Sequence, residues 1–315
     1  MKKNMKRFAA SIIAIRFSIT FVSATFLSCS EIRTQENLRV QLKDGLQMAV
    51  VKENTQPTLR IILPGAQPSD NSIEVLFPEH VTIRKHGHSE AEQLYLFQPG
   101  NKGERPSWRS IDRSLEYERN FPGSIHMLAR ATLEEYGVRF EYVFTNRSEV
   151  EYDMVYAVTD PRLTSIFHDV RLERTYVHHS DGFELLASET PERLTMPLDK
   201  WLPCRYLVSY TWPVPATLVE RRADGIMYYN KSRTVDSPFI ATLSEDRQWV
   251  FASFTSQFDN AGNVWSNPQL TCQHVDPQSS LLPGKQMTIE VNIFIVRGSV
   301  EDAFAIAMRQ RNLKK

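Results

Sequence analysis

Short runs in which apolar and polar residues alternate recur along the first hundred residues of the chain. They are separated by Asp-Gly, Pro-Gly or Pro, and they cover 38–43, 46–51, 58–63, 72–77, 80–85 and 93–97. Alternation directs successive side chains to opposite faces of a strand, and a spacing of about ten residues with turn signals between runs is typical of β-sandwiches and barrels. We therefore expect strands throughout this part of the chain.

From Ser107 onward the regular rhythm of short runs is lost, but the preference for strands continues. Residues 125–134 and 137–146 predict a strand pair. The second run alternates with apolar residues at Val138, Phe140, Tyr142 and Phe144. Further runs rich in aromatic and β-branched residues lie at 151–159, 205–212, 225–230, 239–243, 248–255 and 287–296. Such residues favour strands, so the chain is predicted to be all-β.

One long helix is expected, at the C-terminal end of the chain. Ser299 is placed to cap it and Asp302 stands at the third helical position. Apolar residues follow at helical spacing: Val300, Phe304, Ala307 and Met308. The fold class predicted is a large antiparallel sandwich of two sheets with a short C-terminal helix. Because no repeat or low-complexity linker interrupts it, we expect a single domain over residues 38–315.

Residues 1–28 have the pattern of a secretion signal, with basic residues before a mainly apolar stretch. The sequence Phe26-Leu27-Ser28-Cys29 resembles a bacterial lipobox, which predicts that Cys29 is lipidated and that residues 29–37 form a tether. An uncleaved anchor is the alternative, but the 12 residues from Phe17 to Ser28 are fewer than the roughly 20 that cross a bilayer. We expect a bacterial cell-envelope protein, lipid-anchored on the periplasmic or outer-membrane face, or a secreted one.

The charge balance argues against nucleic acid as a partner. The whole chain carries 37 basic and 37 acidic residues, and residues 1–28 hold five of the basic ones and none of the acidic ones. The mature chain therefore has 32 basic against 37 acidic residues. Since binding to a phosphate backbone depends on its neutralisation by Lys and Arg, a mildly acidic protein is not expected to bind nucleic acid.

The cysteines leave two alternatives open. With Cys29 assigned to lipid, Cys204 and Cys272 remain, and in an oxidising compartment they either pair as a disulfide or stay as two buried thiols. The chain has no C-x-x-C or H-E-x-x-H spacing. The sequence therefore predicts no metal site of a known pattern, and no cofactor.

The stretch from Asn263 to Pro277 is the best candidate for a functional site, because it collects chemically active side chains in what is predicted to be a turn-rich loop. These side chains are Trp265, Cys272, His274 and Asp276. His274 and Asp276 are two positions apart, so in an extended segment they lie on the same face.

Three features of the sequence together resemble the galactose mutarotase-like β-supersandwich family. They are the turn Thr145-Asn146-Arg147-Ser148 between strands, the run Cys272-Gln273-His274-Val275-Asp276-Pro277 followed by Leu282-Pro283-Gly284-Lys285, and the helix start at residues 298–303. The chain is most similar to exported members found in polysaccharide-degrading bacteria. The resemblance implies two large antiparallel sheets with a concave face that binds sugars. Members of the family include aldose epimerases, polysaccharide-lyase and glycosidase domains, and plain binding modules.

Sugar ring opening needs a general acid and a general base on opposite sides of the substrate. In this chain His274 can supply the acid, and Asp276 or a more distant acid such as Glu290 can supply the carboxylate. His274 and Asp276 are the candidate catalytic residues. The epimerases of this family use a glutamate as base, and no position of this chain aligns with that glutamate.

Sugar binding makes smaller demands, because sugar rings stack on aromatic side chains and their hydroxyl groups bond to charged ones. The candidate binding residues are Arg205, Trp212, Tyr210 and Trp265. We expect Arg205 and Trp212 to line one pocket with His274 and Asp276. Core packing explains the aromatic residues of the strand at 205–212 nearly as well.

Three functional classes therefore remain at this stage. The first is carbohydrate binding on the concave face, and the second is an enzyme that uses His274, either a sugar epimerase or a polysaccharide lyase or hydrolase. A lyase or hydrolase would need a tyrosine or paired carboxylates, for which Tyr210, Glu116 and Glu118 are the candidates. The third class is a structural lipoprotein without catalysis.

Overall fold

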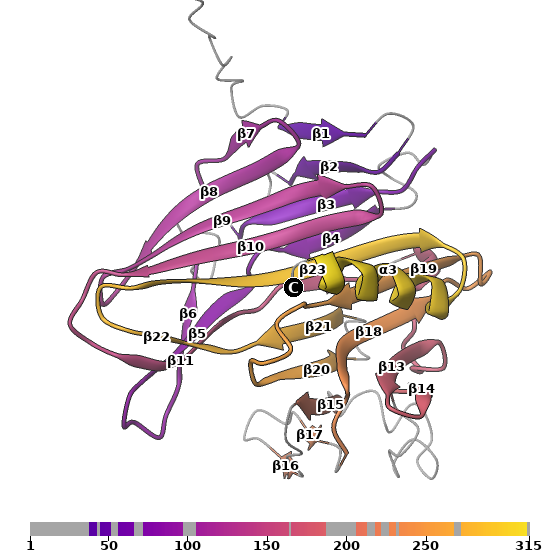
Figure 1. Ribbon diagram of the computed structural model, residues 1–315. Helices are drawn as coiled ribbons and strands as arrows, with labels where there is room; N and C mark the ends of the chain where they lie inside the picture. Colours follow the sequence, from indigo (N-terminus) through magenta and orange to yellow (C-terminus); the bar gives the residue numbers. More distant parts are fainter. Residues whose placement is uncertain are drawn as a thin grey trace, which may run out of the picture. The chain divides into compact units, whose positions relative to one another are not determined.

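Three β-sheets and one helix make up the described part of the chain (Figure 1). The computed structural model describes residues 38–42, 45–51, 56–65, 72–96, 105–163, 165–186, 206–212, 218–221, 227–230, 233–267 and 272–313. The predicted signal (1–28), Cys29, the tether (29–37), Cys204 and Arg205 lie outside these residues, so their assignments stay predictions. Within the described residues, no helix has both the length and the apolar character that crossing a membrane requires.

The largest sheet has ten strands in the order β1-β2-β3-β4-β12-β21-β20-β15-β17-β16. Its strands are β1 (Arg39–Gln41), β2 (Gln47–Val50), β3 (Thr58–Ile62), β4 (Ser72–Leu76), β12 (Asp160–Arg162), β21 (Cys272–Pro277), β20 (Gly262–Asn267), β15 (Tyr206–Trp212), β17 (Met227–Asn230) and β16 (Leu218–Arg221). All its neighbouring pairs are antiparallel except β15 with β17, which is parallel.

The second sheet has nine strands in the order β14-β13-β18-β19-β23-β10-β9-β8-β7. Its strands are β14 (Gly182–Leu185), β13 (Thr175–His179), β18 (Ser237–Leu243), β19 (Trp249–Phe254), β23 (Gln286–Arg297), β10 (Gly137–Asn146), β9 (Ile125–Glu134), β8 (Ser114–Phe121) and β7 (Arg109–Ile111). Every neighbouring pair in this sheet is antiparallel.

A third, four-stranded sheet departs from the predicted two-sheet arrangement. It contains β22 (Ser279–Leu281), β11 (Tyr152–Ala157), β5 (His80–Lys85) and β6 (Glu92–Tyr95) in that order. It joins the ten-stranded sheet covalently, since β11 leads within a few residues into β12 and β4 leads into β5. A short 3₁₀ helix, η2 (Ser165–Phe167), follows β12.

The main hydrophobic core lies between the two large sheets. The ten-stranded sheet contributes side chains such as Leu59 and Val75, and the nine-stranded sheet contributes Phe140, Tyr142 and Phe251. All five are fully buried. Buried and half-buried residues alternate throughout β9 and, from Val138 onward, in β10, which shows that only one face of these strands enters this core. The all-β sandwich predicted from the alternating sequence pattern is confirmed.

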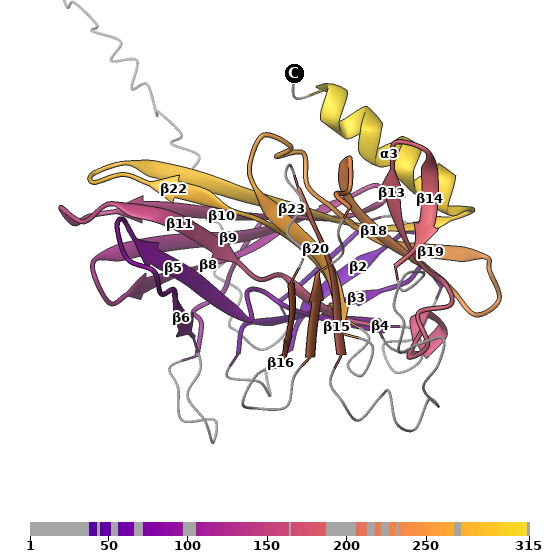
Figure 2. The same ribbon diagram turned by 90° about the horizontal axis from the view of Figure 1, so that it is seen from below.

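The C-terminal helix α3 (Val300–Leu313) covers the opposite face of the nine-stranded sheet (Figure 2). It buries Ala303 and Ala307 against Ala241, Ala252 and neighbouring residues of β18, β19 and β23. The predicted cap is present: the Ser299 hydroxyl accepts a hydrogen bond from the Asp302 amide at 3.2 Å, and the Asp302 carboxylate accepts one from the Ser299 amide at 2.8 Å. This reciprocal pair is a capping box, with aspartate in place of the more usual glutamate.

Two sequence expectations are corrected by the structure. The stretch 263–277 is not a turn-rich loop, because strands β20 and β21 take up nearly all its described residues and pair with each other from Gly262↔Pro277 to Asn267↔Cys272. In addition, β7 and β8 were not predicted, because the regular spacing of short alternating runs is lost after Ser107. In β8 the residues Leu115, Glu116 and Tyr117 are all buried, so the simple alternation of apolar and polar residues breaks down there.

Candidate functional site

The two faces of the β20–β21 pair are identified by the contact of Gln273. Its amide Nε2 donates a hydrogen bond to the hydroxyl of Thr242 on β18, in the nine-stranded sheet. Gln273 therefore points into the space between the sheets, which we call the inner face. Because side chains alternate along a strand, Cys272, His274 and Asp276 point to the other side, which we call the outer face.

Trp265 lies directly opposite His274 in the register and shares the outer face with it. Their rings are stacked, with centroids 3.7 Å apart and planes inclined by 5°. The indole Nε1 of Trp265 also donates a hydrogen bond of 2.6 Å to Asp276 Oδ2. The expectation that His274 and Asp276 share a face is thus confirmed, and Trp265 is a strand residue that connects them.

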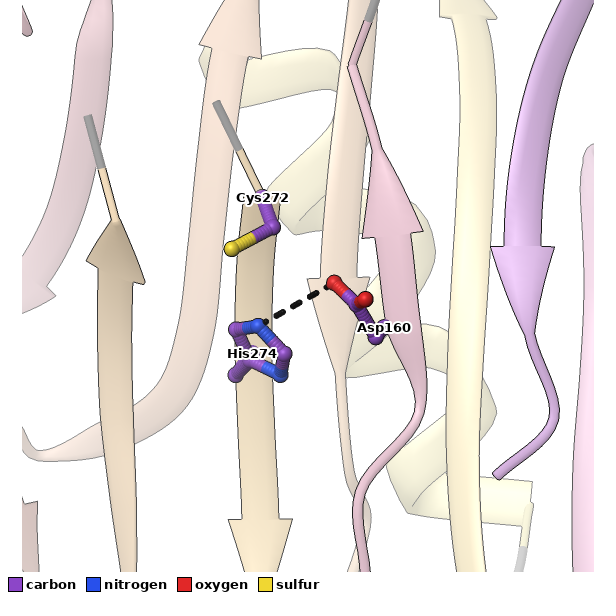
Figure 3. A group of neighbouring side chains, drawn as sticks. All are labelled: Asp160, Cys272 and His274. Atoms are coloured by element: carbon purple, nitrogen blue, oxygen red, sulfur yellow. Dashed lines mark ion pairs between the residues drawn. The ribbon is translucent and has the colours of Figure 1, made fainter. Parts of the chain in front are cut away.

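The ion-pair partner of His274 is Asp160, not Asp276. His274 Nε2 lies 3.4 Å from Asp160 Oδ1, and the Arg162 Nε donates to the other carboxylate oxygen at 3.2 Å. The pairing of β12 with β21 places Arg162 opposite Cys272, which brings Asp160 beside His274. Figure 3 shows Asp160, Cys272 and His274 projecting toward one another from these two neighbouring strands.

These ionisable side chains are deeply buried. The exposed fractions of His274, Asp160, Asp276 and Cys272 are only 1–3%. Burial alone would lower the pKa of His274, but the Cys272 sulfur and the Asp160 carboxylate outweigh it and raise that pKa well above its usual value. Burial would raise the pKa of Asp160, but the close contact with the charged His274, together with Arg162, lowers it instead. At neutral pH the imidazolium form of His274 beside an ionised Asp160 is therefore favoured.

Asp276 and Cys272 shift in the other direction, because burial dominates for both. Burial raises the pKa of Asp276 to about 6, although the charge of His274 and the hydrogen bond from Trp265 partly offset it. Burial also raises the pKa of the Cys272 thiol, which favours the neutral thiol. The cluster therefore combines three chemical groups: the imidazolium of His274, which can act as an acid, the carboxyl group of Asp276, which titrates near pH 6, and the soft sulfur atom of Cys272.

Trp212 was expected to line a pocket with His274, and this expectation is wrong. Ser266 pairs with Gln273 and therefore lies on the inner face, and Val264 and Gly262, two and four positions before it on the same strand, lie on that face too. Trp212 pairs with Gly262, so it also points to the inner face. Its ring lies against Gly262, and the side chain is 3% exposed. Trp212 is thus a core residue on the opposite side of the sheet from His274. Tyr210 lies on β15 opposite Val264, and its role stays a prediction.

Two further expectations concern Cys272 and His274. Cys272 is a buried free thiol in the structure, whereas Cys204 lies outside the described residues, so the state of the cysteine pair stays a prediction. The side chain of His274 is almost completely buried, with 1% of its surface exposed. The catalytic roles of His274 and Asp276 therefore stay predictions.

Glu116 and Glu118, the carboxylates considered for a lyase or hydrolase, form ion pairs on the nine-stranded sheet. Glu116 bonds to Arg130 at 2.8 Å, and Arg109 bridges Glu116 and Glu118 at 3.0 and 2.6 Å. Both belong to β8, outside the sheet that holds His274. Their partners indicate a structural role.

The residue that sequence reasoning missed is Asp160. It precedes Pro161 in a three-residue strand, far from His274 in the sequence, and no local spacing links the two. Only the pairing of β12 with β21 brings them together, and a single sequence does not disclose that pairing.

Beyond the buried cluster, the outer face carries charged side chains that reach solvent. Arg60 and Glu74, paired across β3 and β4, are joined by a hydrogen bond of 2.6 Å and are 36% and 39% exposed. Arg162 on the adjacent β12 is 42% exposed while it bonds to buried Asp160. The half-buried Trp265 completes a row of side chains from β3 to β20.

Comparisons with known proteins add information on the backbone fold. No protein-family model and no curated protein matches the chain. Among solved structures, a galactose mutarotase related enzyme from Lactobacillus acidophilus is similar at a TM-score of 0.47 and 9% identity, covering 84% of this chain and 98% of that one. A galactose mutarotase-like protein from Lactobacillus casei is similar at 0.43 and 8%, covering 82% and 100%.

An α-N-acetylgalactosaminidase from Bifidobacterium bifidum, in complex with N-acetylgalactosamine, is similar at a TM-score of 0.48 and 10% identity. That alignment covers 87% of this chain but 38% of the enzyme, so the chain spans little more than a third of it. The solved structures similar to this chain thus include galactose mutarotase-like proteins, as the sequence resemblance predicts.

Proposed function

We propose that this protein binds carbohydrate on the outer face of the ten-stranded sheet, with Trp265 as the stacking platform and Arg162 and Arg60 as hydroxyl-binding groups. The observation that carries the proposal is the contrast within this face. The outer face of the sheet is turned away from the core, so solvated polar residues alone would be sufficient there. It nevertheless carries a rigidly held aromatic ring and partly exposed arginine side chains. The sequence resemblance to galactose mutarotase-like proteins points to the same class of ligand.

Trp265 is suited to stacking because its position is fixed before any ligand arrives. His274 covers one face of the indole, and the hydrogen bond to Asp276 holds its edge. The side chain is nevertheless only half-buried, which leaves part of the ring accessible. A ring that is already ordered loses little conformational entropy on binding, so the contact contributes more to affinity.

Arg162 and Arg60 provide donors for sugar hydroxyl groups. Strands in a sheet are about 4.8 Å apart, so Arg162 on β12 and Trp265 on β20, two strands away, are separated by about 10 Å across the sheet. This distance suits one or two sugar units. The guanidinium groups are partly held by Glu74 and Asp160, which orients them without burying them.

An enzyme that uses His274 is the second candidate. The raised pKa of His274 makes it an acid at neutral pH, and Asp276 titrates near pH 6, so the two protonation states that sugar ring opening needs are present on one face. Their burial argues against direct contact with a substrate, and for this reason binding is preferred.

The proposed location is the bacterial cell envelope, through lipid on Cys29. Replacing Cys29 by Ser should release the protein from the membrane fraction or leave it unprocessed. Recovery of the unmodified wild-type protein in the soluble periplasm would contradict the lipid anchor.

The binding proposal is tested by a glycan array probed with residues 38–315, followed by product analysis of every glycan that binds. We expect binding without turnover, and reduced binding in Trp265→Ala and Arg162→Ala. Arg84→Ala is the matched control, since Arg84 forms a similar ion pair with Asp153 and is 36% exposed, but belongs to the four-stranded sheet. New products from a bound glycan would favour the enzyme, and an array without any hit would contradict carbohydrate binding.

A further inference from the structure

Three side chains of different chemistry converge at one point of the outer face. One ligand atom each from Asp160, Cys272 and His274 can be chosen so that all three lie within 4.8 Å of one another. In Figure 3 the sulfur of Cys272 and the carboxylate of Asp160 lie toward the same edge of the imidazole ring, the edge that carries Nε2. These atoms come from two neighbouring strands, whose positions are fixed by the sheet.

This arrangement differs from a nucleophilic triad. In a triad the histidine uses one ring nitrogen for the cysteine and the other for the carboxylate, so its partners lie on opposite edges of the ring. Here both partners face the same edge, and Cys272 is buried at 3% exposure. Convergence of a thiol, an imidazole nitrogen and a carboxylate oxygen on one point is the geometry of a metal site.

The separations also fit a small divalent metal ion. Zinc binds cysteine sulfur at about 2.3 Å and histidine nitrogen or carboxylate oxygen at about 2.0–2.2 Å, which for a tetrahedral centre puts ligand atoms roughly 3.3–3.8 Å apart. His274 Nε2 and Asp160 Oδ1 are 3.4 Å apart, within that range. All three potential ligand atoms lie within 4.8 Å of one another, so side-chain movements of about 1 Å would bring them to the separations of a tetrahedral centre.

Unsatisfied polar atoms provide an independent observation. Asp160 Oδ1 and His274 Nε2 are buried, and apart from their mutual ion pair at 3.4 Å neither atom makes a hydrogen bond. Buried polar atoms without hydrogen bonds are uncommon in folded proteins, and each calls for an explanation such as a bound ion. These two atoms point at each other and at the sulfur, so a single metal ion would satisfy both of them.

We propose that Asp160, Cys272 and His274 form a binding site for a transition metal ion of the zinc type. Thiolate and imidazole ligands select zinc and similar ions over magnesium or calcium, which prefer oxygen ligands. The described residues supply three ligands, which leaves one position of a tetrahedral centre for a further ligand such as water. Trp265, stacked on the ring, holds the imidazole in the ligating orientation.

The test uses the full chain, stripped with a chelator and titrated with Co²⁺ and Zn²⁺. We expect one metal ion per chain, a thiolate-to-cobalt charge-transfer absorption, and its loss when Zn²⁺ displaces the cobalt. Cys272→Ala should abolish the absorption, and His274→Gln should weaken cobalt binding at least tenfold.

Matched controls separate this site from the other cysteines and histidines. Cys204→Ser and His178→Gln should keep both the stoichiometry and the absorption, since His178 is committed to Asp236 at 2.8 Å. In case the ligand variants fail to fold, the wild-type protein gives a second readout: its thermal midpoint should fall on chelation and recover with one equivalent of Zn²⁺. A wild-type midpoint that does not respond to chelator or Zn²⁺, or an absorption that survives in a folded Cys272→Ala protein, would overturn the proposal.

Discussion

The inner and outer faces of the β20–β21 pair carry opposite chemistry within the same few residues. On the inner face, Gln273 bonds to Thr242, whose hydroxyl also bonds to Thr175 at 2.8 Å, so a neutral polar group is accommodated in the core. On the outer face, the adjacent His274 is surrounded by a carboxylate, a thiol and an indole ring. Both residues are equally buried.

This difference separates structural from functional burial. Neutral amide and hydroxyl groups that satisfy one another cost little to bury. Ionisable groups are expensive to bury even when paired, and their retention on the outer face indicates a use beyond stability. Buried side-chain atoms without hydrogen bonds occur on both faces, such as Gln273 Oε1 on the inner face and Asp276 Oδ1 on the outer face, so the contrast is one of neutral against ionisable groups. Substitutions on the two faces should therefore differ in their effects on stability and on its pH dependence. Stability is measured by denaturant unfolding with a chelator present, so that a metal ion does not contribute.

The largest effect is expected on the outer face from Asp160→Ala. This change leaves the buried imidazolium of His274 without its carboxylate, and breaking a buried ion pair costs about 3–5 kcal/mol. The control is Asp153→Ala, which breaks the partly exposed pair with Arg84 and should cost about 1 kcal/mol or less. Equal costs for the two variants would contradict the special position of the His274 pair.

A pH-dependent effect of similar size is expected from Asp276. Its carboxyl group faces His274 and Trp265, and it also interacts with Glu79, in the bend before β5, and with His80, the first residue of β5. The pKa rises from 3.8 to about 6 on folding, so between these values the folded state retains a proton that the unfolded state releases. The free energy of unfolding should therefore fall by about 3 kcal/mol as pH rises through this window.

Asp276→Asn should remove that slope, because asparagine does not titrate. The contributions of His274, whose folded pKa is raised, and Asp160, whose folded pKa is lowered, lie above and below this window and should remain. A variant whose unfolding free energy keeps the wild-type slope between pH 4 and 6 would show that Asp276 is not the titrating group.

On the inner face the sensitive position is Gly262. A Cβ atom there would overlap the ring of Trp212 and the backbone oxygen of Asp276, so Gly262→Ala should destabilise the fold by about 1–3 kcal/mol through overpacking. In a double-mutant cycle, part of this cost should disappear when Trp212 is replaced by Leu. Additive effects of the two changes would contradict the placement of Trp212 over Gly262.

The smallest stability effect is expected from Trp265→Phe. It keeps an aromatic ring over His274 but removes the hydrogen bond to Asp276, at a cost of about 1–2 kcal/mol. Since that bond lowers the pKa of Asp276, the same variant should shift the titration of Asp276 upward. An unchanged pH profile would argue against this hydrogen bond.

The sequence alone predicted the elements well where packing follows a simple period. The bounds of β9 and β10 were predicted to the residue, because each strand buries every second side chain. Alternation also placed His274 and Asp276 on one face. It did not place Trp212, because the face of a residue on β15 relative to β21 depends on the registers of β15 with β20 and of β20 with β21. Asp160 was missed for the same reason, since its link to His274 exists only through strand pairing.

The central claim, that Trp265 on the outer face is the platform for a sugar, is tested most directly by calorimetric titration of the best glycan-array ligand. Trp265→Ala should weaken binding by at least tenfold while the protein remains folded. Trp249→Ala, which removes a half-buried tryptophan from β19 of the other sheet, should leave the affinity within about twofold of the wild-type value. Equal affinities of the wild-type protein and a folded Trp265→Ala variant would contradict the claim.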